Sequence, residues 1–159
     1  MRDFQEADWP QVWAIIRDVV RAADTFPFDP DMTEEQARAI WIERPPGRTV
    51  VAVDGDRVLG TAKMGANRGG PGAHIATASF MVAEAERGRG VGSALCRETI
   101  KWAEEQGYAG VQFNAVVETN IHAVTLYERL GFRILGTVPR AFEHPARGRV
   151  GLHLMYLEF

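Results

Sequence analysis

The chain has 159 residues, of which 46% are hydrophobic and 25% are charged, and its net charge at pH 7 is −3. This length suits one domain with a single core, so we expect one domain over residues 1–159. The acidic balance argues against a nucleic-acid-binding protein. The lack of a ~20-residue apolar run or a signal-peptide segment predicts a cytoplasmic protein without a membrane partner.

The first third of the chain predicts two helices. Asp8 can cap a helix that has Pro10 in its first turn. Its expected apolar face consists of Val12, Ile15, Ile16, Val19 and Val20. Thr33 and Gln36 are typical of a capping box, which predicts a second, short helix ending near Glu43.

Apolar runs and turn residues predict the strands. After a stub at Met1–Phe4, the expected strands are Thr49–Val53, Val58–Met64, Ile75–Val82, Val111–Val117, Arg133–Val138 and Val150–Phe159. Two helices lie between the later strands: a long one closed by Gly107 and another at Ile121–Leu130. Cys96, the only cysteine, falls in the long helix, so we expect a buried structural thiol and no internal disulfide.

The most informative stretch is Arg87-Gly88-Arg89-Gly90-Val91-Gly92-Ser93, which joins a predicted strand to the long helix. The expected apolar face of that helix consists of Val91, Ala94, Leu95, Trp102 and Ala103. Free N–H groups and the helix dipole make such an N-terminus an anion site. Gly90 and Gly92 let an anion approach the backbone closely, and Arg87 and Arg89 add positive charge.

Three kinds of phosphate-binding loop compete for this stretch. A nucleotide P-loop needs Lys-Ser/Thr after its last glycine, whereas Gly92 is followed by Ser93-Ala94. A dinucleotide fingerprint needs G-x-G-x-x-G, whereas here only one residue separates Gly90 from the last glycine, Gly92. The stretch instead resembles the Arg/Gln-x-x-Gly-x-Gly/Ala loop with which GCN5-related N-acetyltransferases bind the pyrophosphate of coenzyme A.

A second segment carries the same resemblance. Asn120 is followed by Ala123, Leu126, Tyr127, Leu130, Gly131 and Phe132. This is similar to the family's Asn-x-x-Ala-x-x-Leu-Tyr-x-x-x-Gly-Phe segment, in the family's order and spacing. The resemblance implies an α/β fold with a mixed, mostly antiparallel central sheet and helices on both faces. It also implies an N-acetyltransferase with acetyl-CoA as acetyl donor.

The resemblance also implies roles for individual residues. In the family, the strand before the loop separates from its neighbour, and its backbone binds the pantetheine arm and the thioester. That strand end is Phe80-Met81-Val82 here. The tyrosine at the position of Tyr127 protonates the leaving thiolate, although a core tyrosine bonded to a backbone carbonyl is the alternative. Asn120 either binds the pantetheine amide or simply caps its helix.

The general base is not identified by the resemblance. Many relatives carry a glutamate five residues before the asparagine, and Ala115 stands at that place. The preceding residue, Asn114, is expected on the strand face opposite Phe113, Ala115 and Val117, as a buried amide that needs a partner. It either holds the substrate or a relay water, or it bonds across the sheet.

The acceptor is expected to be a small amine. Phe113–Val117, Val138–Phe142 and Gly151–His153 resemble a subgroup that includes fungal enzymes acetylating proline analogues such as azetidine-2-carboxylate. The candidate pocket residues are Asn114, His153, Glu143, His144, and the connection Thr25–Met32 with Phe26 and Phe28. Of these, Glu143 and His144 are expected in a solvated loop. His153 is either a satisfied strand residue or a ligand contact.

We therefore expect acetyl transfer from acetyl-CoA to a small-molecule amine, an amino acid or analogue, by direct attack on the thioester. Two alternatives stay open: a protein N-terminal or lysine acetyltransferase, and a non-catalytic acyl-CoA-binding module. None of the candidate residues has metal-ligand spacing, so we expect no metal. The sequence leaves a homodimer open.

Overall fold

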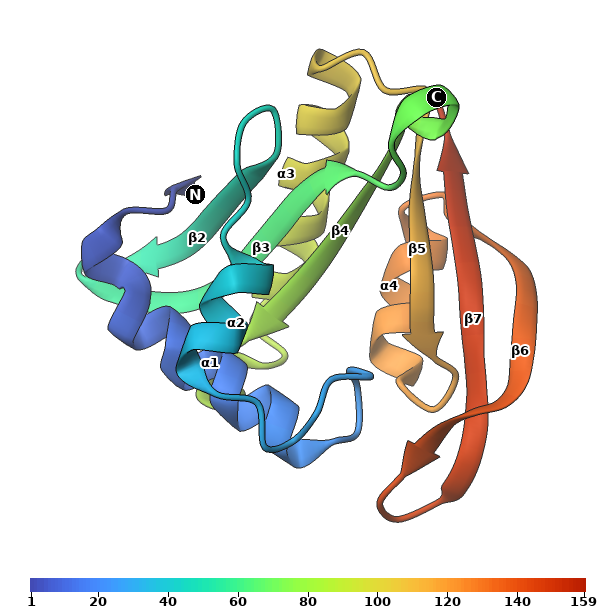
Figure 1. Ribbon diagram of the computed structural model, residues 1–159, viewed down its shortest axis with the longest axis horizontal. Coiled ribbons are helices and arrows are strands. Elements are labelled where there is room, and N and C mark those ends of the chain that lie inside the picture. The colour runs from blue at the N-terminus through green and yellow to red at the C-terminus, as the bar shows by residue number, and fades with distance from the viewer.

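Seven strands form one mixed sheet in the computed structural model, which describes residues 1–159 (Figure 1). The strands are β1 (Arg2–Asp3), β2 (Arg48–Asp54), β3 (Arg57–Ala66), β4 (Ile75–Val82), β5 (Gly110–Val117), β6 (Arg133–His144) and β7 (Gly148–Glu158). Their order is β1-β2-β3-β4-β5-β7-β6, in which only β4 and β5 are parallel. The expected mixed, mostly antiparallel sheet is confirmed.

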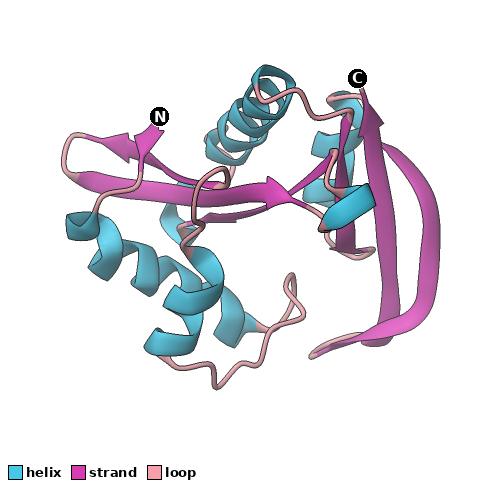
Figure 2. Cartoon of the chain, turned by 45° about the horizontal axis from the view of Figure 1, so that its top comes forward, coloured by secondary structure: helices cyan, strands magenta, loops and turns pink.

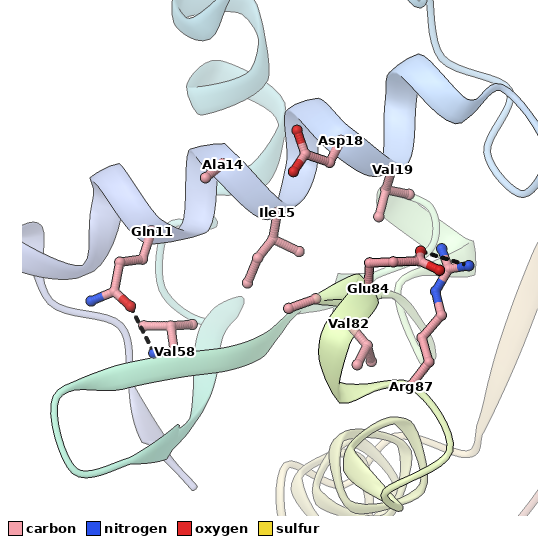
Figure 3. Close-up of a pocket in the computed structure, with 10 residues that line it drawn as sticks. Gln11, Ala14, Ile15, Asp18, Val19, Val58, Val82, Glu84 and Arg87 are labelled. Atoms are coloured by element: carbon pink, nitrogen blue, oxygen red, sulfur yellow. Dashed lines mark hydrogen bonds and ion pairs between the residues drawn. The ribbon is translucent and has the colours of Figure 1, made fainter.

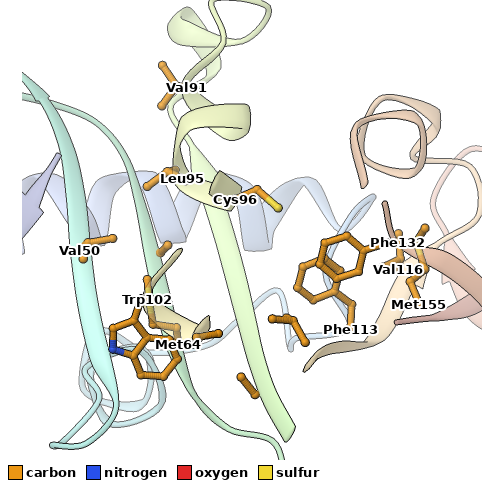
Figure 4. Packing of buried hydrophobic residues seen from close by; sticks show 14 of the residues in the cluster. Val50, Met64, Val91, Leu95, Cys96, Trp102, Phe113, Val116, Phe132 and Met155 are labelled. Carbon is orange, nitrogen blue, oxygen red and sulfur yellow. The ribbon is translucent and has the colours of Figure 1, made fainter. Parts of the chain in front are cut away.

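Helices cover both faces of this sheet (Figure 2). The helices are α1 (Trp9–Ala22), α2 (Glu34–Trp41), α3 (Val91–Glu105) and α4 (Ile121–Arg129). Three single 3₁₀ turns, η1 (Glu6–Asp8), η2 (Gly70–Gly72) and η3 (Glu84–Glu86), complete the fold. One hydrophobic cluster joins α1 and α2 to the sheet, and a larger one joins α3 and α4 to the other face (Figure 4). None of the helices is long and apolar enough to cross a membrane.

Local sequence signals account for part of the structure of α1 and α2. All five expected apolar residues of α1 are buried. Thr33 and Gln36 form the expected capping box of α2, although the helix ends at Trp41 rather than near Glu43. Asp8 is the N-cap of α1 and Pro10 lies in its first turn, as predicted, but the Asp8 carboxylate makes no capping bond and binds the Arg2 guanidinium and the Gln5 N–H instead.

The face of α3 follows the prediction with one exception. Its buried residues include Val91, Leu95, Trp102 and Ala103, whereas Ala94 is exposed. Cys96 is fully buried in the same cluster, and burial raises the pKa of its thiol to about 12. The thiol is therefore protonated at neutral pH and is no nucleophile.

The two parallel strands separate along their length, and this opening positions the site. Ile75 pairs with Gly110 and Ala76 with Val111, and no further residues of β4 and β5 pair. Strands β4 and β5 then diverge toward their C-terminal ends (Figure 1). At the closed end the packing is tight, because a Cβ on Gly110 would lie 2.5 Å from the Leu157 carbonyl oxygen.

Strand β5 departs from simple alternation. A bulge lies between Phe113 and Val116, so that these two side chains share the α3–α4 face. Val117 lies in a separate cluster with Phe142 and Val150. The expectation that Phe113 and Val117 share a face is therefore wrong, since the bulge inserts one extra residue into the alternation.

The β6–β7 hairpin is longer than expected. β6 continues to His144, and Glu143 and His144 pair with Arg149 and Gly148. The two residues therefore belong to a strand and not to a loop. The signal is weak in the sequence, because β6 is an exposed edge strand with a bulge between Val138 and Phe142 and has no apolar alternation.

Candidate active site

The edge of β4 that faces the opening carries unpaired backbone groups. The Asn67 N–H donates to the Ile75 carbonyl (2.7 Å), and the Ala83 N–H donates to the Leu59 carbonyl (2.9 Å). Because hydrogen-bonded pairs alternate along antiparallel strands, the odd-numbered residues of β4 bond to β3. The even-numbered residues Ala78, Phe80 and Val82 therefore direct their N–H and C=O groups toward β5.

The predicted strand residues Phe80, Met81 and Val82 therefore do not all face the opening. Phe80 and Val82 face the opening through their backbones, with side chains packed on the α3–α4 cluster. The backbone of Met81 is directed to β3, and its side chain is buried in the α1–α2 cluster.

The glycine-rich loop follows β4 and ends at the first turn of α3. Gly88 and Gly90 have φ angles of 77° and 82°, which L side chains rarely adopt. Gly90 is the N-cap of α3 and offers no side chain to accept from the helix N–H groups. The first-turn N–H groups, from Val91 to Ser93, are left for an external acceptor. A Cβ on Gly88 or Gly90 would meet nothing within 4 Å, so the loop is open to a ligand.

The loop arginines are already paired with acidic neighbours. Arg87 lies 2.9 Å from Glu84, and Arg89 lies 2.5 Å from Glu86. The Glu86 carboxylate is buried and also binds Arg57 at 3.0 Å. The positive charge expected beside the loop is thus largely compensated, and the backbone N–H groups remain as the main anion donors.

Tyr127 lies on α4 among aromatic rings that line the α3–α4 side of the opening. Its ring centroid is 4.6 Å from that of Phe113, 5.9 Å from Phe132 and 6.1 Å from Phe80. Its hydroxyl makes no hydrogen bond to a protein group. Burial raises the pKa of Tyr127 well above its ordinary value, and the nearby Cys96 raises it further. The phenol therefore keeps its proton at neutral pH and can donate it.

Asn120 is the N-cap of α4, as one of its two interpretations required. Its Oδ1 accepts from the Ala123 N–H at 3.3 Å. The Nδ2 group is not used by this cap and can donate to a ligand.

Asn114 is exposed, so the expectation of a buried amide is wrong. Its Oδ1 accepts from Gln112 Nε2 at 2.8 Å, and its Nδ2 donates to Asn67 Oδ1 at 2.7 Å. Asn114 lies on the face opposite Phe113, as predicted, together with Gln112, and Asn67 from the end of β3 meets it there. Sequence reasoning missed Asn67, because its 47-residue separation from Asn114 carries no local signal.

The pairing of β7 with β5 and β6 shows on which face of the sheet His153 lies. His153 pairs with Val116 and Thr137, and its Nδ1 lies 2.7 Å from Thr137 Oγ1. Paired residues share a face, so His153 lies on the α4 side and is a satisfied strand residue. The α1–α2 side carries instead the apolar row Val117–Leu152–Val138, in which Val138 is 61% exposed.

Glu118, which directly follows β5, is another residue that sequence reasoning missed. Glu118 Oε1 accepts from the Gly151 N–H at 2.6 Å, and the Glu118 N–H donates to the Gly151 carbonyl. A Cβ on Gly151 would lie 2.6 Å from Thr137 Cγ2 and 2.8 Å from Glu118 Oε2, so a larger residue there would displace these side chains. Glu118 thus fixes β5 against β7 beside the opening.

A hollow of about 270 Å³ lies beside the glycine-rich loop, on the α1 side of the sheet (Figure 3). Residues of α1 form one wall, and the ends of β3 and β4 form the other. Its lining includes Asp18, Val19, Val58, Val82, Glu84 and Arg87. No group of three or more His, Cys, Asp or Glu side chains is placed to bind a metal ion.

Backbone donors at a helix N-terminus, an open strand edge and a protonated phenol suit a ligand with phosphates at one end and a thioester at the other. This arrangement defines a coenzyme A-dependent acyltransferase. The chain belongs to the acetyltransferase (GNAT) family, whose model matches residues 13–132. The acetyl donor of the family is acetyl-CoA, which two distant neighbours of the same fold hold in their solved structures.

Known proteins resemble the chain to different extents. A GCN5-related N-acetyltransferase from Kribbella flavida is 55% identical with a TM-score of 0.96, and the match covers 99% of this chain and 96% of that one. N-acetyltransferase aca1 of Schizosaccharomyces pombe is 26% identical over 154 residues, covering 87% of this chain and 71% of that protein. Protein SPT10 of Saccharomyces cerevisiae is 33% identical over 72 residues, which are 45% of this chain, and the chain spans only 11% of that protein.

Proposed function

We propose that this N-acetyltransferase acetylates the amine of a small molecule, an amino acid or analogue, by direct attack on the acetyl-CoA thioester. The observation that carries the proposal is the opening between β4 and β5, which leads from the first turn of α3 to Tyr127. The apolar row Val117–Leu152–Val138, beside the C-terminal end of β5, favours an acceptor with an apolar body. A proline analogue such as azetidine-2-carboxylate has that character.

The residues around the opening are given the following roles. The loop Arg87–Ser93 binds the pyrophosphate, and Asn120 Nδ2 donates to the pantetheine arm. The backbones of Phe80 and Val82 bind the arm and the thioester, where an N–H group stabilises the developing oxyanion. Tyr127 donates its proton to the departing thiolate. Since the place of the usual base is Ala115, an α-amine with a pKa of ~8 loses its proton through water.

The test of the proposal is a thiol-release assay with acetyl-CoA and a panel of amines. The panel contains L-proline, azetidine-2-carboxylate, L-phenylalanine, benzylamine and an N-terminally free alanyl peptide. We expect release above the hydrolysis background with at least one small amine. Release with the peptide alone would favour a protein acetyltransferase, and coenzyme A binding without release would favour a binding module.

Asn114→Leu tests the assignment of Asn114 to the acceptor site. Because Asn114 is exposed, leucine should leave the fold and coenzyme A binding intact. If Asn114 and Asn67 hold the acceptor, kcat/KM for the amine falls by about 10-fold or more, as expected for the loss of a hydrogen bond to a charged group. Gln112→Leu is the matched control, since it removes one bond to the same amide without touching Asn67. Unchanged amine kinetics in Asn114→Leu would make the residue structural.

The setting of the enzyme is also a proposal. A single buried cysteine suits a reducing cytoplasm.

Apolar side chains are exposed on the edge strand β6, at Ile134, Leu135 and Val138. A homodimer through this edge would be detected by light scattering at micromolar concentration, whereas a monomer mass would exclude it.

A further inference from the structure

A buried carboxylate directly precedes the glycine-rich loop. Glu86 ends the turn η3 and is 4% exposed, which makes it the least exposed acidic residue of the chain. A charge at this depth is tolerated when it is paired. Arg57 Nη2 lies 3.0 Å from Glu86 Oε1, and Arg89 Nη1 donates to Glu86 Oε2 at 2.5 Å. Glu86 therefore joins two arginines that come from different parts of the chain.

The contact with Arg89 restrains the part of the loop with the widest choice of backbone conformations. Arg89 lies between Gly88 and Gly90, both of which have positive φ angles. Gly90 is also the N-cap of α3 and offers no side chain to fix the turn. The Arg89 side chain binds the Glu86 carboxylate, and the Arg89 N–H donates to the Glu86 carbonyl at 3.4 Å. Glu86 thus holds the residue that directly precedes the N-cap.

The contact with Arg57 connects this part of the loop to the body of the fold. Arg57 is the first residue of β3, and the residues on either side of it bond to the Gln11 amide of α1. Gln11 Nε2 donates to the Asp56 carbonyl at 2.9 Å. The Val58 N–H donates to Gln11 Oε1 at 2.9 Å (Figure 3). The backbone of Arg57 is therefore held on both sides, and its guanidinium gives Glu86 an anchor outside the loop.

The restrained loop presents free N–H groups. The Arg87 and Arg89 N–H groups donate to carbonyls of η3, whereas those of Gly88 and Gly90 make no hydrogen bond within the protein. These two donors adjoin the first-turn N–H groups of α3. Successive backbone N–H groups of this kind bind an anion when the backbone keeps its curved shape. That shape depends on Arg89, and hence on Glu86.

Electrostatic repulsion alone predicts the opposite effect of this carboxylate. A negative charge near an anion site weakens the binding of a diphosphate. Arg57 and Arg89 outnumber the one carboxylate, and both are more than half exposed. A carboxylate that acted only through its charge would lower the affinity for coenzyme A. One that acts by holding the loop raises it, so the sign of the effect distinguishes the two roles.

We propose that Glu86 is a positioning residue of the coenzyme A site, which rests on the role that the proposed function gives to the loop Arg87–Ser93. Its carboxylate holds Arg89 to Arg57 and keeps the free N–H groups of the loop in place before the ligand arrives. A loop that is ordered in advance binds more tightly, because less conformational entropy is lost on binding. Glu86 touches no reacting atom, so its effect falls on the affinity for coenzyme A and not on kcat.

The test compares Glu86→Gln with Glu84→Gln in calorimetric titrations with coenzyme A. Both variants remove one negative charge that pairs with a loop arginine, but the Glu84 side chain is 78% exposed. Glu86→Gln raises the Kd by about 10-fold or more, as expected for the loss of a hydrogen bond between charged groups, whereas Glu84→Gln stays within about 2-fold. With a saturating amine, KM for acetyl-CoA rises in Glu86→Gln while kcat stays within about 2-fold of the wild type.

Arg57→Gln is a second variant that leaves the loop sequence intact. Arg57 is exposed, so the variant should fold, which circular dichroism checks. Loss of the anchor raises the Kd of coenzyme A here too. The double variant with Glu86→Gln binds no more weakly than Glu86→Gln alone, because both substitutions act through one contact.

Three results would overturn the positioning role. An unchanged Kd in folded Glu86→Gln makes the carboxylate a structural group, and a lower Kd makes it an electrostatic opponent of the phosphates. An unchanged Kd in Arg57→Gln removes the anchor. Gly92→Val separates these failures from failure of the proposed function. Full coenzyme A binding in Gly92→Val removes the loop assignment itself, whereas lost binding there with an unchanged Kd in Glu86→Gln removes only the positioning role.

Discussion

Tyr127→Phe is expected to lower kcat by about 100-fold or more while acetyl-CoA binding is retained, since a general acid contributes about that much. The hydroxyl has no protein partner, and burial raises the pKa of Tyr127, so the group stays protonated through neutral and alkaline pH. Removing it leaves the aromatic contacts with Phe113 and Phe132 in place. The loss should therefore appear in the chemical step, measured by thiol release at saturating amine and acetyl-CoA.

Tyr108→Phe provides the matched control for this substitution. Tyr108 packs on Trp102 with ring centroids 5.2 Å apart, away from the opening between β4 and β5. Removing the Tyr108 hydroxyl should leave kcat unchanged. If Tyr127→Phe also turned over at the wild-type rate, water and not the phenol would protonate the thiolate.

Much of the fold could be predicted from local patterns. The predicted strand Ile75–Val82 has the bounds of β4, because a mostly apolar segment ends there shortly before the glycine-rich turn. The capping box at Thr33 and the apolar face of α1 likewise depend on residues within one or two turns of each other. Such signals survive folding, since neighbours in the helix remain neighbours in the structure.

The features that were missed depend on contacts between distant segments. The bulge in β5 reverses the alternation after Phe113, and nothing in the apolar pattern marks it. The partner of Asn114 is Asn67, which the sheet brings across from the end of β3. The length of β6 is set by pairing with β7 rather than by its own composition. Each of these is a tertiary effect that overrides local preference.

In the candidate site too, local patterns predict some features and tertiary contacts determine the others. The order of motifs indicated the loop, Tyr127 and Asn120, but two other properties came only from the structure. One is that the backbones of Phe80 and Val82 face β5 whereas that of Met81 faces β3, which follows from the register of β4 on β3. The other is the pairing of Arg87 with Glu84 and of Arg89 with Glu86, which leaves the backbone N–H groups as the unpaired donors of the loop.

Gly92→Val is the substitution with the largest expected effect on affinity, because the proposed function has the pyrophosphate bound by backbone N–H groups. Gly92 lies in the first turn of α3 without a positive φ, and an added Cβ would meet only Val82 Cγ2, at 3.8 Å. Valine should thus be accepted by the fold, while its methyl groups cover the N–H groups that face the ligand. Gly90→Val would be a poorer test, because its φ of 82° would strain the ligand-free protein as well.

For the wild-type protein, coenzyme A at about 100 times its Kd should stabilise the native state by ~2.7 kcal/mol and raise Tm by several degrees. In Gly92→Val this shift should disappear, while the Tm without ligand stays close to that of the wild type. Ala94→Val is the control, because it places the same side chain at an exposed position two residues further along α3. It should keep the full shift. A full shift in Gly92→Val would mean that the pyrophosphate does not approach the backbone at this turn, and the assignment of Arg87–Ser93 to coenzyme A would have to be abandoned.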